Sequence, residues 1–485
     1  MLKSIKIILP FFLVMAAASF ARIIKVPADQ PTIQSGINAA ENGDTVLVYP
    51  GTYFENVNFH AKRIVITSRF YESGDLSFIQ STIINGSRPV NPDTSSCVLI
   101  ISGEDSTAVL QGFTITGGKG TKWRDEHGAG LYREGGGILI AKSSPTVRFN
   151  VIMNNEAANT SGVTSAGGGG IRAGDGNPKI LNNIVTSNIG RYGAGIVLNF
   201  TGAVVRNNII TKNSGGQDYG GGALWMNHDG ASQKIIENNT ITANKVVGIY
   251  VYQGSSIIKN CIIWADPPTS AVQIVVRTGG PTVSYSNVLG GYSGTGNIFS
   301  DPQFADSTLT LKDKSPCIDA GDKSIEYNDV ENSLAPGNAL FPSRGSLSND
   351  MGAYGGPGAA KLPNFNLPTS VRLNVSSLPA EYRLYQNYPN PFNPSTAISY
   401  QLLAFSHVTI KVYNLLGSEI TTLVNEDKPA GKYSVQFNSQ QTINCRQLSS
   451  GVYFYSMQVR ASNTGKQPQS SSAVFVETKK FILLK

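Results

Sequence analysis

Charged residues are scarce in this chain, and their scarcity excludes a disordered protein. Asp, Glu, Lys and Arg make up 15% of its 485 residues, whereas hydrophobic residues make up 40%. Disordered chains have the opposite balance, because they cannot bury enough apolar surface to offset the entropy lost on folding. The 51 glycines favour instead a β-rich protein with many tight turns.

The main body of the chain also lacks an excess of positive charge. The whole sequence has a formal net charge of +7, but residues 361–485 carry 12 basic and 5 acidic side chains, and residues 1–21 carry two lysines. This leaves 25 basic and 27 acidic groups in residues 22–360. A nucleic-acid-binding surface needs a basic stripe, so we expect no nucleic-acid partner.

Cysteine and long apolar runs are scarce as well. Cysteine occurs four times, at Cys97, Cys261, Cys317 and Cys445, and these positions match no zinc or redox spacing. After residue 21 no apolar run approaches the roughly 18 residues that span a bilayer. We therefore expect no transmembrane segment in the mature chain. The cysteine pairing stays open.

Residues 1–21 predict an export signal. Lys3 and Lys6 supply a positive start, the stretch IILPFFLVMAAA supplies a short apolar core, and Ser19 and Ala21 offer small residues for cleavage. The mature protein should therefore be exported.

A short phrase recurs through the centre of the chain, as in LNNIVTSN, RNNIITKN and ENNTITAN. The position of its second asparagine recurs at intervals of 22 to 33 residues, at Asn150, Asn183, Asn208, Asn239, Cys261 and Asn287. A second polar position follows five residues after the first five of these, at Asn155, Asn188, Asn213, Asn244 and Asp266. Internal similarity at this period is typical of a stacked repeat architecture.

The content of each repeat predicts strands rather than helices. Runs such as GGGILI and GAGIVL are short and β-branched, and apolar residues alternate within them, as Ile138 and Ile140 do. Short strands that each stack on their counterpart one repeat away describe a parallel β-solenoid. Asparagine suits its corners, because it tolerates left-handed backbone and its amide can bond to the asparagine of the next coil.

These repeats resemble the right-handed parallel β-helix of pectate-lyase-like proteins over residues 24–355. The opening VPADQPTIQSGINAAENGDTVLVYPGTY is similar to that family's usual entry. The resemblance implies an all-β domain over residues 22–360, with a capping helix through TIQSGINAAENG at its N-terminal end. Ile33, Ile37 and Ala40 have the spacing of a helix with one buried face.

The end of this domain, residues 300–357, is named the closing segment. Its stretches SDPQFAD, SPCIDAGD and NDMGAYGGP resemble the final part of many secreted bacterial β-helix proteins. Its acids admit two interpretations, calcium ligands or turn caps: Asp301, Asp306, Asp319, Asp322 and Asp350.

After a Pro- and Ser-rich linker at residues 361–380, alternating strands and turns predict a small Ig-like antiparallel β-sandwich at residues 381–485. The segments YPNPFNP, LLG, AGKY, SGVYFY and KKFILLK resemble the C-terminal sorting domain of the type IX secretion system. That resemblance implies handling by the type IX machinery in a Gram-negative bacterium. The protein would then be released or attached to the outer surface.

Insertions between the asparagine rows and the glycine corners are the candidate binding site. They occupy the same point in each repeat, so we expect them to line one edge of the solenoid. The longest runs from Gly117 to Gly137 and also contains Glu126 and Arg133. Aromatic faces stack on sugar rings and charged groups orient hydroxyls or uronates, so the candidate glycan-binding residues are Trp123, Arg124, Asp125, His127, Tyr132, Arg172, Asp175, Arg191, Tyr192, Asp218, Tyr219, His228 and Asp229.

Local motifs do not decide whether the chain is an enzyme. The Gly-His-Gly of polygalacturonases is absent, as are the glutamine and aspartate motifs of pectin esterases. A lyase would need a Lys or Arg base, with calcium or a second cation to stabilise the charge that develops. No local signature identifies such a base, so the catalytic residues and any metal site stay undetermined.

Two functional hypotheses follow. In the first, the secreted or surface protein binds an extracellular polysaccharide. Whether it also cleaves the polymer stays open, with a lyase favoured over a glycoside hydrolase if it is catalytic. The alternative is a non-enzymatic structural or adhesion protein. The alternative predicts no Lys or Arg that converges with two acids within about 5 Å above a strand face, the range of strong mutual effects on pKa.

Overall fold

The computed structural model describes residues 21–229, 233–264, 272–364, 381–402, 406–428, 431–440, 448–461 and 475–484. The chain forms two compact units, residues 1–366 and 367–485. The predicted export signal (except Ala21), most of the predicted linker, and the positions Asp266 and Cys445 lie outside the described residues. Among the described residues no helix is long and apolar enough to cross a membrane.

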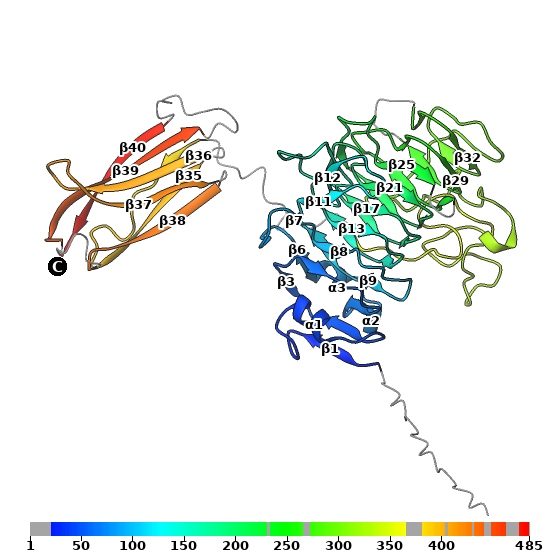
Figure 1. The fold of residues 1–485 in the computed structure, drawn as a ribbon, viewed down its shortest axis with the longest axis horizontal. Coiled ribbons are helices and arrows are strands. Elements are labelled where there is room, and N and C mark those ends of the chain that lie inside the picture. The colour runs from blue at the N-terminus through cyan, green and yellow to red at the C-terminus, as the bar shows by residue number, and fades with distance from the viewer. Residues whose placement is uncertain are drawn as a thin grey trace, which may run out of the picture. The chain divides into compact units, whose positions relative to one another are not determined.

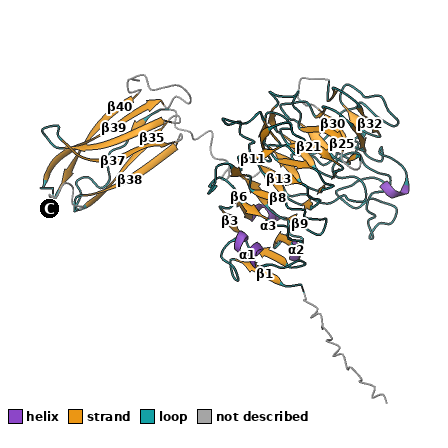
Figure 2. Ribbon diagram, viewed as in Figure 1, coloured by secondary structure: helices purple, strands orange, loops and turns teal. Residues whose placement is uncertain are grey.

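The first unit is a solenoid of three parallel sheets, in which each turn of the chain adds one strand to each sheet (Figures 1 and 2). Sheet 1 contains β1 (Ile23–Val26), β2 (Thr45–Val48), β5 (Val65–Ser68), β9 (Val109–Gln111), β14 (Thr146–Arg148), β18 (Lys179–Leu181), β22 (Val204–Arg206), β26 (Lys234–Glu237), β29 (Ser255–Lys259) and β32 (Gly280–Ser284). Sheet 2 contains β3 (Gly51–Tyr53), β6 (Thr82–Asn85), β10 (Thr114–Thr116), β15 (Val151–Met153), β19 (Ile184–Thr186), β23 (Ile209–Thr211), β27 (Thr240–Thr242), β30 (Ile262–Trp264) and β33 (Asn287–Val288). Sheet 3 contains β4 (Val57–Asn58), β8 (Val98–Ile100), β13 (Ile138–Ala141), β17 (Ile171–Gly174), β21 (Ile196–Thr201), β25 (Leu224–Asp229), β28 (Ile249–Val251) and β31 (Ile274–Val276). The predicted right-handed parallel β-helix is confirmed.

Shorter elements lie in the segments between and after the strands of the three sheets. The helices are α1 (Ile33–Ala39), α2 (Phe70–Ser73), α3 (Ser77–Ser81) and the 3-10 turn η1 (Ile325–Tyr327). A small fourth sheet contains β7 (Thr94–Ser95), β11 (Gly120–Arg124), β12 (Leu131–Glu134) and β16 (Ala166–Gly167), and β20 (Ile189–Gly190) pairs with β24 (Ser214–Gly215).

The N-terminal end of the solenoid is covered by α1, as the sequence predicts. Thr32 and Ser35 form a capping box at its start, and Ile33 and Ile37 are fully buried. The carboxylate of Glu55 accepts hydrogen bonds from the Ile33 and Gln34 backbone N–H groups, both at 2.9 Å. A helix N-terminus attracts a carboxylate, so this contact fixes the cap to the coil beneath it.

Two buried asparagine ladders run along the solenoid, one on each side of sheet 2. In the first, the Nδ2 of Asn150, Asn183 and Asn208 each donates to the Oδ1 of the asparagine one coil further on, at 3.0 to 3.1 Å, and the row ends at Asn239. The second ladder repeats this geometry five residues later, through Asn155, Asn188, Asn213 and Asn244. All eight side chains are at most 1% exposed. The predicted amide ladder is therefore present.

The ladder continues beyond Asn239 with different residues. The Asn239 N–H donates to Cys261 Sγ at 3.5 Å, and the Cys261 N–H donates to Ser286 Oγ at 3.1 Å. Burial raises the pKa of Cys261 to about 12, so its thiol stays neutral. The expectation for Asn287 is wrong by one residue, because Asn287 pairs with Ile262 in the sheet and Ser286 occupies the ladder position.

The left-handed backbone conformation falls on the residue before each ladder asparagine. Asn182, Asn207, Asn238 and Asn260 have φ angles of 49° to 56°. Their side chains therefore point away from the core and remain available for other partners.

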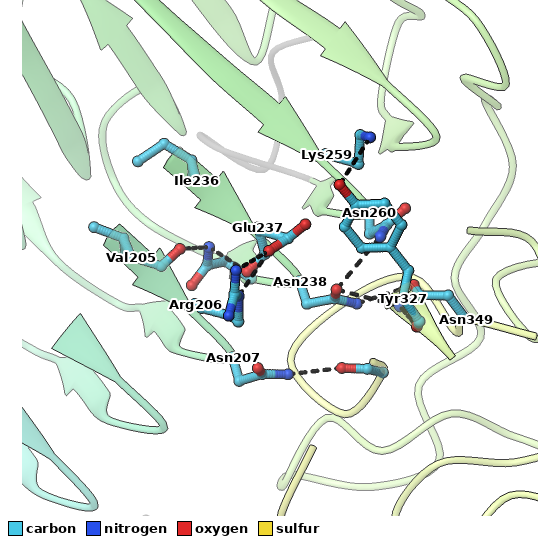
Figure 3. A network of polar contacts seen from close by, with 12 residues as sticks. Val205, Arg206, Asn207, Ile236, Glu237, Asn238, Lys259, Asn260, Tyr327 and Asn349 are labelled. Carbon is cyan, nitrogen blue, oxygen red and sulfur yellow. Dashed lines mark hydrogen bonds and ion pairs between the residues drawn. The ribbon is translucent and has the colours of Figure 1, made fainter. Parts of the chain in front are cut away.

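These outer asparagines hold the closing segment against the corner between sheets 1 and 2. Asn238 Nδ2 donates to the Asp350 carbonyl and to Asn349 Oδ1, and Asn207 Nδ2 donates to the Ala353 and Gly355 carbonyls. Figure 3 shows the side chain of Asn238 next to that of Asn349, with which it exchanges hydrogen bonds. The chain thus runs back along several coils, as far as Asn182, whose Nδ2 donates to the Gly358 carbonyl at 2.9 Å.

The five acids of the closing segment named above all bond to backbone N–H groups. Each accepts at least one hydrogen bond from a backbone N–H: Asp301 from Gln303, Asp306 from Thr308, Asp319 from Ser346, Asp322 from Ser324, and Asp350 from Asp319 and Arg344. Within the described residues no group of three or more His, Cys, Asp or Glu side chains is arranged to hold a metal ion. These contacts match the turn-cap interpretation.

The second unit is an antiparallel sandwich, as the sequence predicts. One sheet contains β34 (Arg383–Leu384), β35 (Ser395–Leu402) and β38 (Gly431–Asn438). The other contains β36 (Ser406–Tyr413), β37 (Glu419–Lys428), β39 (Gly451–Ala461) and β40 (Phe475–Leu483). Tyr400, Tyr455 and Phe481 are buried between them, at 1% exposure or less.

We predict that Asn183→Ala destabilises the solenoid by about 3 kcal/mol, because it leaves buried partners unsatisfied. Asn183 bonds to the Val147 carbonyl and to Asn208, and accepts from the Asn150 backbone. Urea unfolding followed by tryptophan fluorescence measures this unit alone, since Trp123, Trp225 and Trp264 all belong to it. The exposed Asn159 is the matched control, and Asn159→Ala should change stability by less than about 0.5 kcal/mol. Equal effects of the two substitutions would contradict a structural ladder.

We predict that the solenoid loses stability as the pH rises from about 4 to about 8. Burial, with the nearby Asp350 carboxylate, raises the pKa of Asp329 to about 8, and burial raises the pKa of Asp350 to about 7. Since the folded protein favours the protonated forms, their contribution is complete below the ordinary carboxyl pKa of about 4 and is lost as pH rises through 7 to 8. Asp329→Asn should flatten the pH dependence of the urea midpoint, whereas Glu326→Gln, at an exposed site, should leave it unchanged. A wild-type midpoint that rises over this range would contradict the assignment.

Candidate functional site

The outer face of sheet 3 carries an unusual row of side chains. In β17 the residues Ile171 and Ala173 point into the core, so the residue between them, Arg172, points outward. The parallel register places Val197, Trp225 and Tyr250 beside it in the following coils. Asn199 and Asn227 form the next outward row.

The longest insertion folds as a β-hairpin beside this face. Its strands β11 and β12 pair antiparallel, with Trp123 opposite Tyr132, and β12 also pairs with β16 of the next coil. The hairpin therefore belongs to a small sheet of its own. The residues between its strands reach back to sheet 3.

A buried ion triad fastens the hairpin to sheet 3. The Arg172 guanidinium donates to both Glu126 oxygens, at 2.7 and 3.0 Å, and its Nε lies 2.9 Å from Glu134 Oε2. The Arg172 side chain is 0% exposed, and the two carboxylates are 5% and 4% exposed. Two neighbours complete the group, since Trp123 Nε1 donates to Glu126 and the Tyr192 hydroxyl donates to Glu134.

The triad contains two carboxyl groups and only one guanidinium, and the pKa values of the two acids shift in opposite directions. Burial opposes ionisation of Glu126, but the hydrogen bonds and charge of Arg172 outweigh it and hold the pKa of Glu126 below its usual range. Burial raises the pKa of Glu134, and the negative charges of Glu126 and Asp125 add to the rise. Desolvation also raises the pKa of Tyr192 well above its ordinary value, with Glu134 adding to the effect.

The non-enzymatic hypothesis predicts that no cation lies within about 5 Å of two acids above a strand face. This cluster has that geometry. Arg172 has no solvent-accessible surface, however: Glu126 accepts hydrogen bonds from two of its nitrogens, and Glu134 forms an ion pair with the third. The triad therefore acts on the position of the hairpin. It is not placed to contact a polymer.

Above the triad lies a cavity of about 150 Å³, here named the aromatic cavity. Its lining residues are Asp125, Ala129, Tyr132, Glu134, Tyr192, Asn199, Tyr219, Trp225, Asn227 and Tyr252. The rings meet nearly at right angles: Tyr192 with Tyr219 at 83°, and Tyr219 with Tyr252 at 90°. Tyr219 is 37% exposed and Trp225 5%, so the tyrosine is at the opening and the tryptophan is in the wall.

The cavity brings together only part of the predicted binding edge. Asp125, Tyr132, Tyr192 and Tyr219 line it, and Arg172 and Trp123 belong to the anchor beneath it. His127, Asp175 and His228 form a separate group, in which both imidazoles stack on Phe200 and His127 lies 2.8 Å from Asp175. Arg191 pairs with Asp218, which also accepts from Ser165. Arg124 is exposed, and the Asp229 side chain is outside the described set.

Several cavity residues were not among the predicted ones. Asn199, Asn227, Trp225 and Tyr252 come from sheet 3 strands or the position just after them, where the alternation of inward and outward residues could have identified them. Glu134 is the last residue of β12, and the alternation in sheet 3 could not have identified it. Its place at the cavity depends on how the hairpin packs against sheet 3.

Fold and cavity together define a right-handed parallel β-helix protein with an aromatic-lined site on one sheet. Residues 34–288, more than half of the chain, match the family model described as a right-handed beta helix region. The chain belongs to this family. Residues 386–467 match the secretion system C-terminal sorting domain, which marks a protein destined for secretion or for the cell surface.

Other comparisons are weaker. A search of curated proteins finds no match. Among solved structures, a PL6 family alginate lyase is similar, with 15% identity and a TM-score of 0.36, over 56% of this chain and 35% of the lyase. The chain thus spans about a third of that enzyme's length, and the likeness does not extend to its substrate.

We predict that Arg172→Met destabilises the solenoid by about 3–5 kcal/mol, because it leaves two buried carboxylates without their cation. Adding Glu126→Gln and Glu134→Gln to this variant should restore most of the loss, since the repulsion is then removed. Urea unfolding of the three proteins tests this directly. Arg191→Met removes only a partly exposed pair with Asp218, so it should have a much smaller effect. Failure of the double replacement to rescue Arg172→Met would contradict the triad.

Proposed function

We propose that this secreted or cell-surface β-helix protein binds an extracellular polysaccharide, and that the aromatic cavity holds one of its sugar rings. The observation that carries the proposal is the set of tyrosine and tryptophan rings around an opening that also presents amide and carboxylate groups. Sugar rings combine apolar faces with hydroxyls at their edges. Aromatic faces with a few fixed polar groups therefore suit them.

The size of the cavity supports recognition of a single ring. Sites for drug-sized ligands typically have volumes of about 300–1,000 Å³, whereas this cavity has about 150 Å³. A long oligosaccharide would have to extend over the flanking surface. Tyr132 would be at the start of that surface, because it lines the cavity and its hydroxyl lies 3.4 Å from that of the partly exposed Tyr219.

Binding has more support than cleavage. A lyase needs a Lys or Arg that can take a proton from the sugar, but the described cavity lining includes neither residue type. A hydrolase needs two carboxyl groups that flank the bond. Asp125 and Glu134 both line the cavity, yet Glu134 is 3% exposed, with one oxygen accepting from Tyr192 and the other in an ion pair with Arg172. The protein is thus proposed as a glycan-binding protein.

We predict that a glycan array identifies at least one polysaccharide ligand, and that Tyr219→Ala weakens its binding roughly tenfold or more through loss of a stacking face. Isothermal titration with the array ligand measures the change. Tyr71→Ala is the matched control, because Tyr71 is 55% exposed and lies on α2, outside the cavity.

The same samples test for cleavage. Product analysis should show neither new reducing ends nor the ultraviolet absorbance of unsaturated sugars, with or without calcium. Equal losses from Tyr219→Ala and Tyr71→Ala, or no ligand on the array, would contradict the proposed function.

A further inference from the structure

The charges around the aromatic cavity define which sugar it can accept, provided that the proposed function holds. Of the described residues that line it, the only charged ones are Asp125 and Glu134, both acids. Of the two arginines beside the cavity, Arg172 lies beneath these acids with no exposed surface, and the exposed Arg277 stacks on Tyr252 and is not among the lining residues. A uronate would bring a third carboxylate into this partly desolvated space, where no described lining residue is a cation, and this is costly.

We infer that the aromatic cavity is a subsite for an amino sugar that carries a free ammonium group. Three features favour a cation. The Asp125 carboxylate lies at the cavity and is half-buried, so its attraction for a positive charge is screened less than at the open surface. Its Oδ1 accepts from the backbone N–H groups of His127 and Ala129, and its Oδ2 accepts from Asn199 Nδ2 at 3.3 Å, so the carboxylate is held at the cavity wall.

Aromatic faces are the second feature. A cation over a tyrosine or tryptophan face is attracted by the ring's quadrupole, and several faces together form a cage. The protein already shows this interaction at the cavity's own ring, where the Arg277 guanidinium lies 4.2 Å from the Tyr252 centroid. Tyr219 meets Tyr252 at 90°, so the two rings offer differently oriented faces to one ligand.

The third feature is an unused acceptor. Asn227 Nδ2 donates to Asn199 Oδ1 at 3.0 Å, which orients the amide, and the Asn227 Oδ1 is buried without a hydrogen-bond partner. Leaving a buried carbonyl unpaired costs free energy. An ammonium or hydroxyl of the ligand would satisfy it, whereas a carboxylate would not.

Three oligosaccharides of equal length and the same β-1,4 linkage test this inference: glucosamine, glucose and mannuronate oligomers. Isothermal titration at low salt and pH 6 should show the order glucosamine, then glucose, then mannuronate, with at least a tenfold advantage of glucosamine over glucose. The glucosamine advantage should fall as salt screens the charge. It should also fall as pH rises through the titration of the amine.

Asp125→Asn provides the residue-level test. The asparagine keeps an Oδ1 for the two backbone N–H groups but removes the charge, so the ratio of glucosamine to glucose affinity should fall about tenfold. Asp93→Asn, on the far side of the hairpin where Asp93 pairs with Lys122 and Arg133, should leave that ratio unchanged. Urea unfolding of both variants confirms that they are folded.

The outcomes separate this inference from the proposed function. Mannuronate binding at least as tight as glucose, equal affinities for glucosamine and glucose, or an unchanged ratio in Asp125→Asn would overturn the amino-sugar assignment. If Tyr219→Ala still weakened that binding, glycan recognition by the cavity would stand. No binding of any oligomer or array glycan would overturn both.

Discussion

The buried asparagine ladders are the constraint on which the rest of the structure depends. Each amide bonds to its counterpart and to core backbone carbonyls, and the buried setting makes an unpaired amide costly. A coil shifted by one residue would break these bonds and also turn the apolar residues outward. The ladders therefore fix the register that brings Arg172, Trp225 and Tyr250 to the same face of sheet 3, although they are far apart in the sequence.

On that fixed face the binding site is built from two sources. Sheet 3 supplies a rigid floor, and the hairpin of the longest insertion supplies a wall that the Arg172 triad holds in place. The buried Arg172 holds the hairpin in position and does not contact a ligand, because its guanidinium faces Glu126 and Glu134. Because Arg172 is buried, the only charged residues among the described cavity lining are the acids Asp125 and Glu134. The triad that fixes the hairpin therefore also determines which ligand charge the cavity favours.

Much of this could be predicted from the sequence, because the period, the alternation and the paired asparagines are local signals. The ladder position of Asn287 was predicted one residue too far along, since the motif there has lost its asparagine pair and Ser286 takes over the bond. The candidate edge was only partly correct for a different reason. Asp218 pairs with Arg191 and does not line the cavity. This depends on how each loop folds, and the spacing of residues in the sequence does not predict it. Likewise, nothing local shows that the closing segment returns along the outer asparagines as far as Asn182.

A crystal structure of the protein with a β-1,4-linked glucosamine oligomer tests the account most directly. The account predicts one sugar ring between Tyr219 and Tyr252, with its ammonium nitrogen within hydrogen-bond distance of Asp125 and a donor on Asn227 Oδ1. It also predicts that Arg172 stays buried between its two glutamates. An oligomer bound elsewhere on the solenoid, or a hairpin displaced from sheet 3 with Arg172 exposed to the ligand, would contradict it.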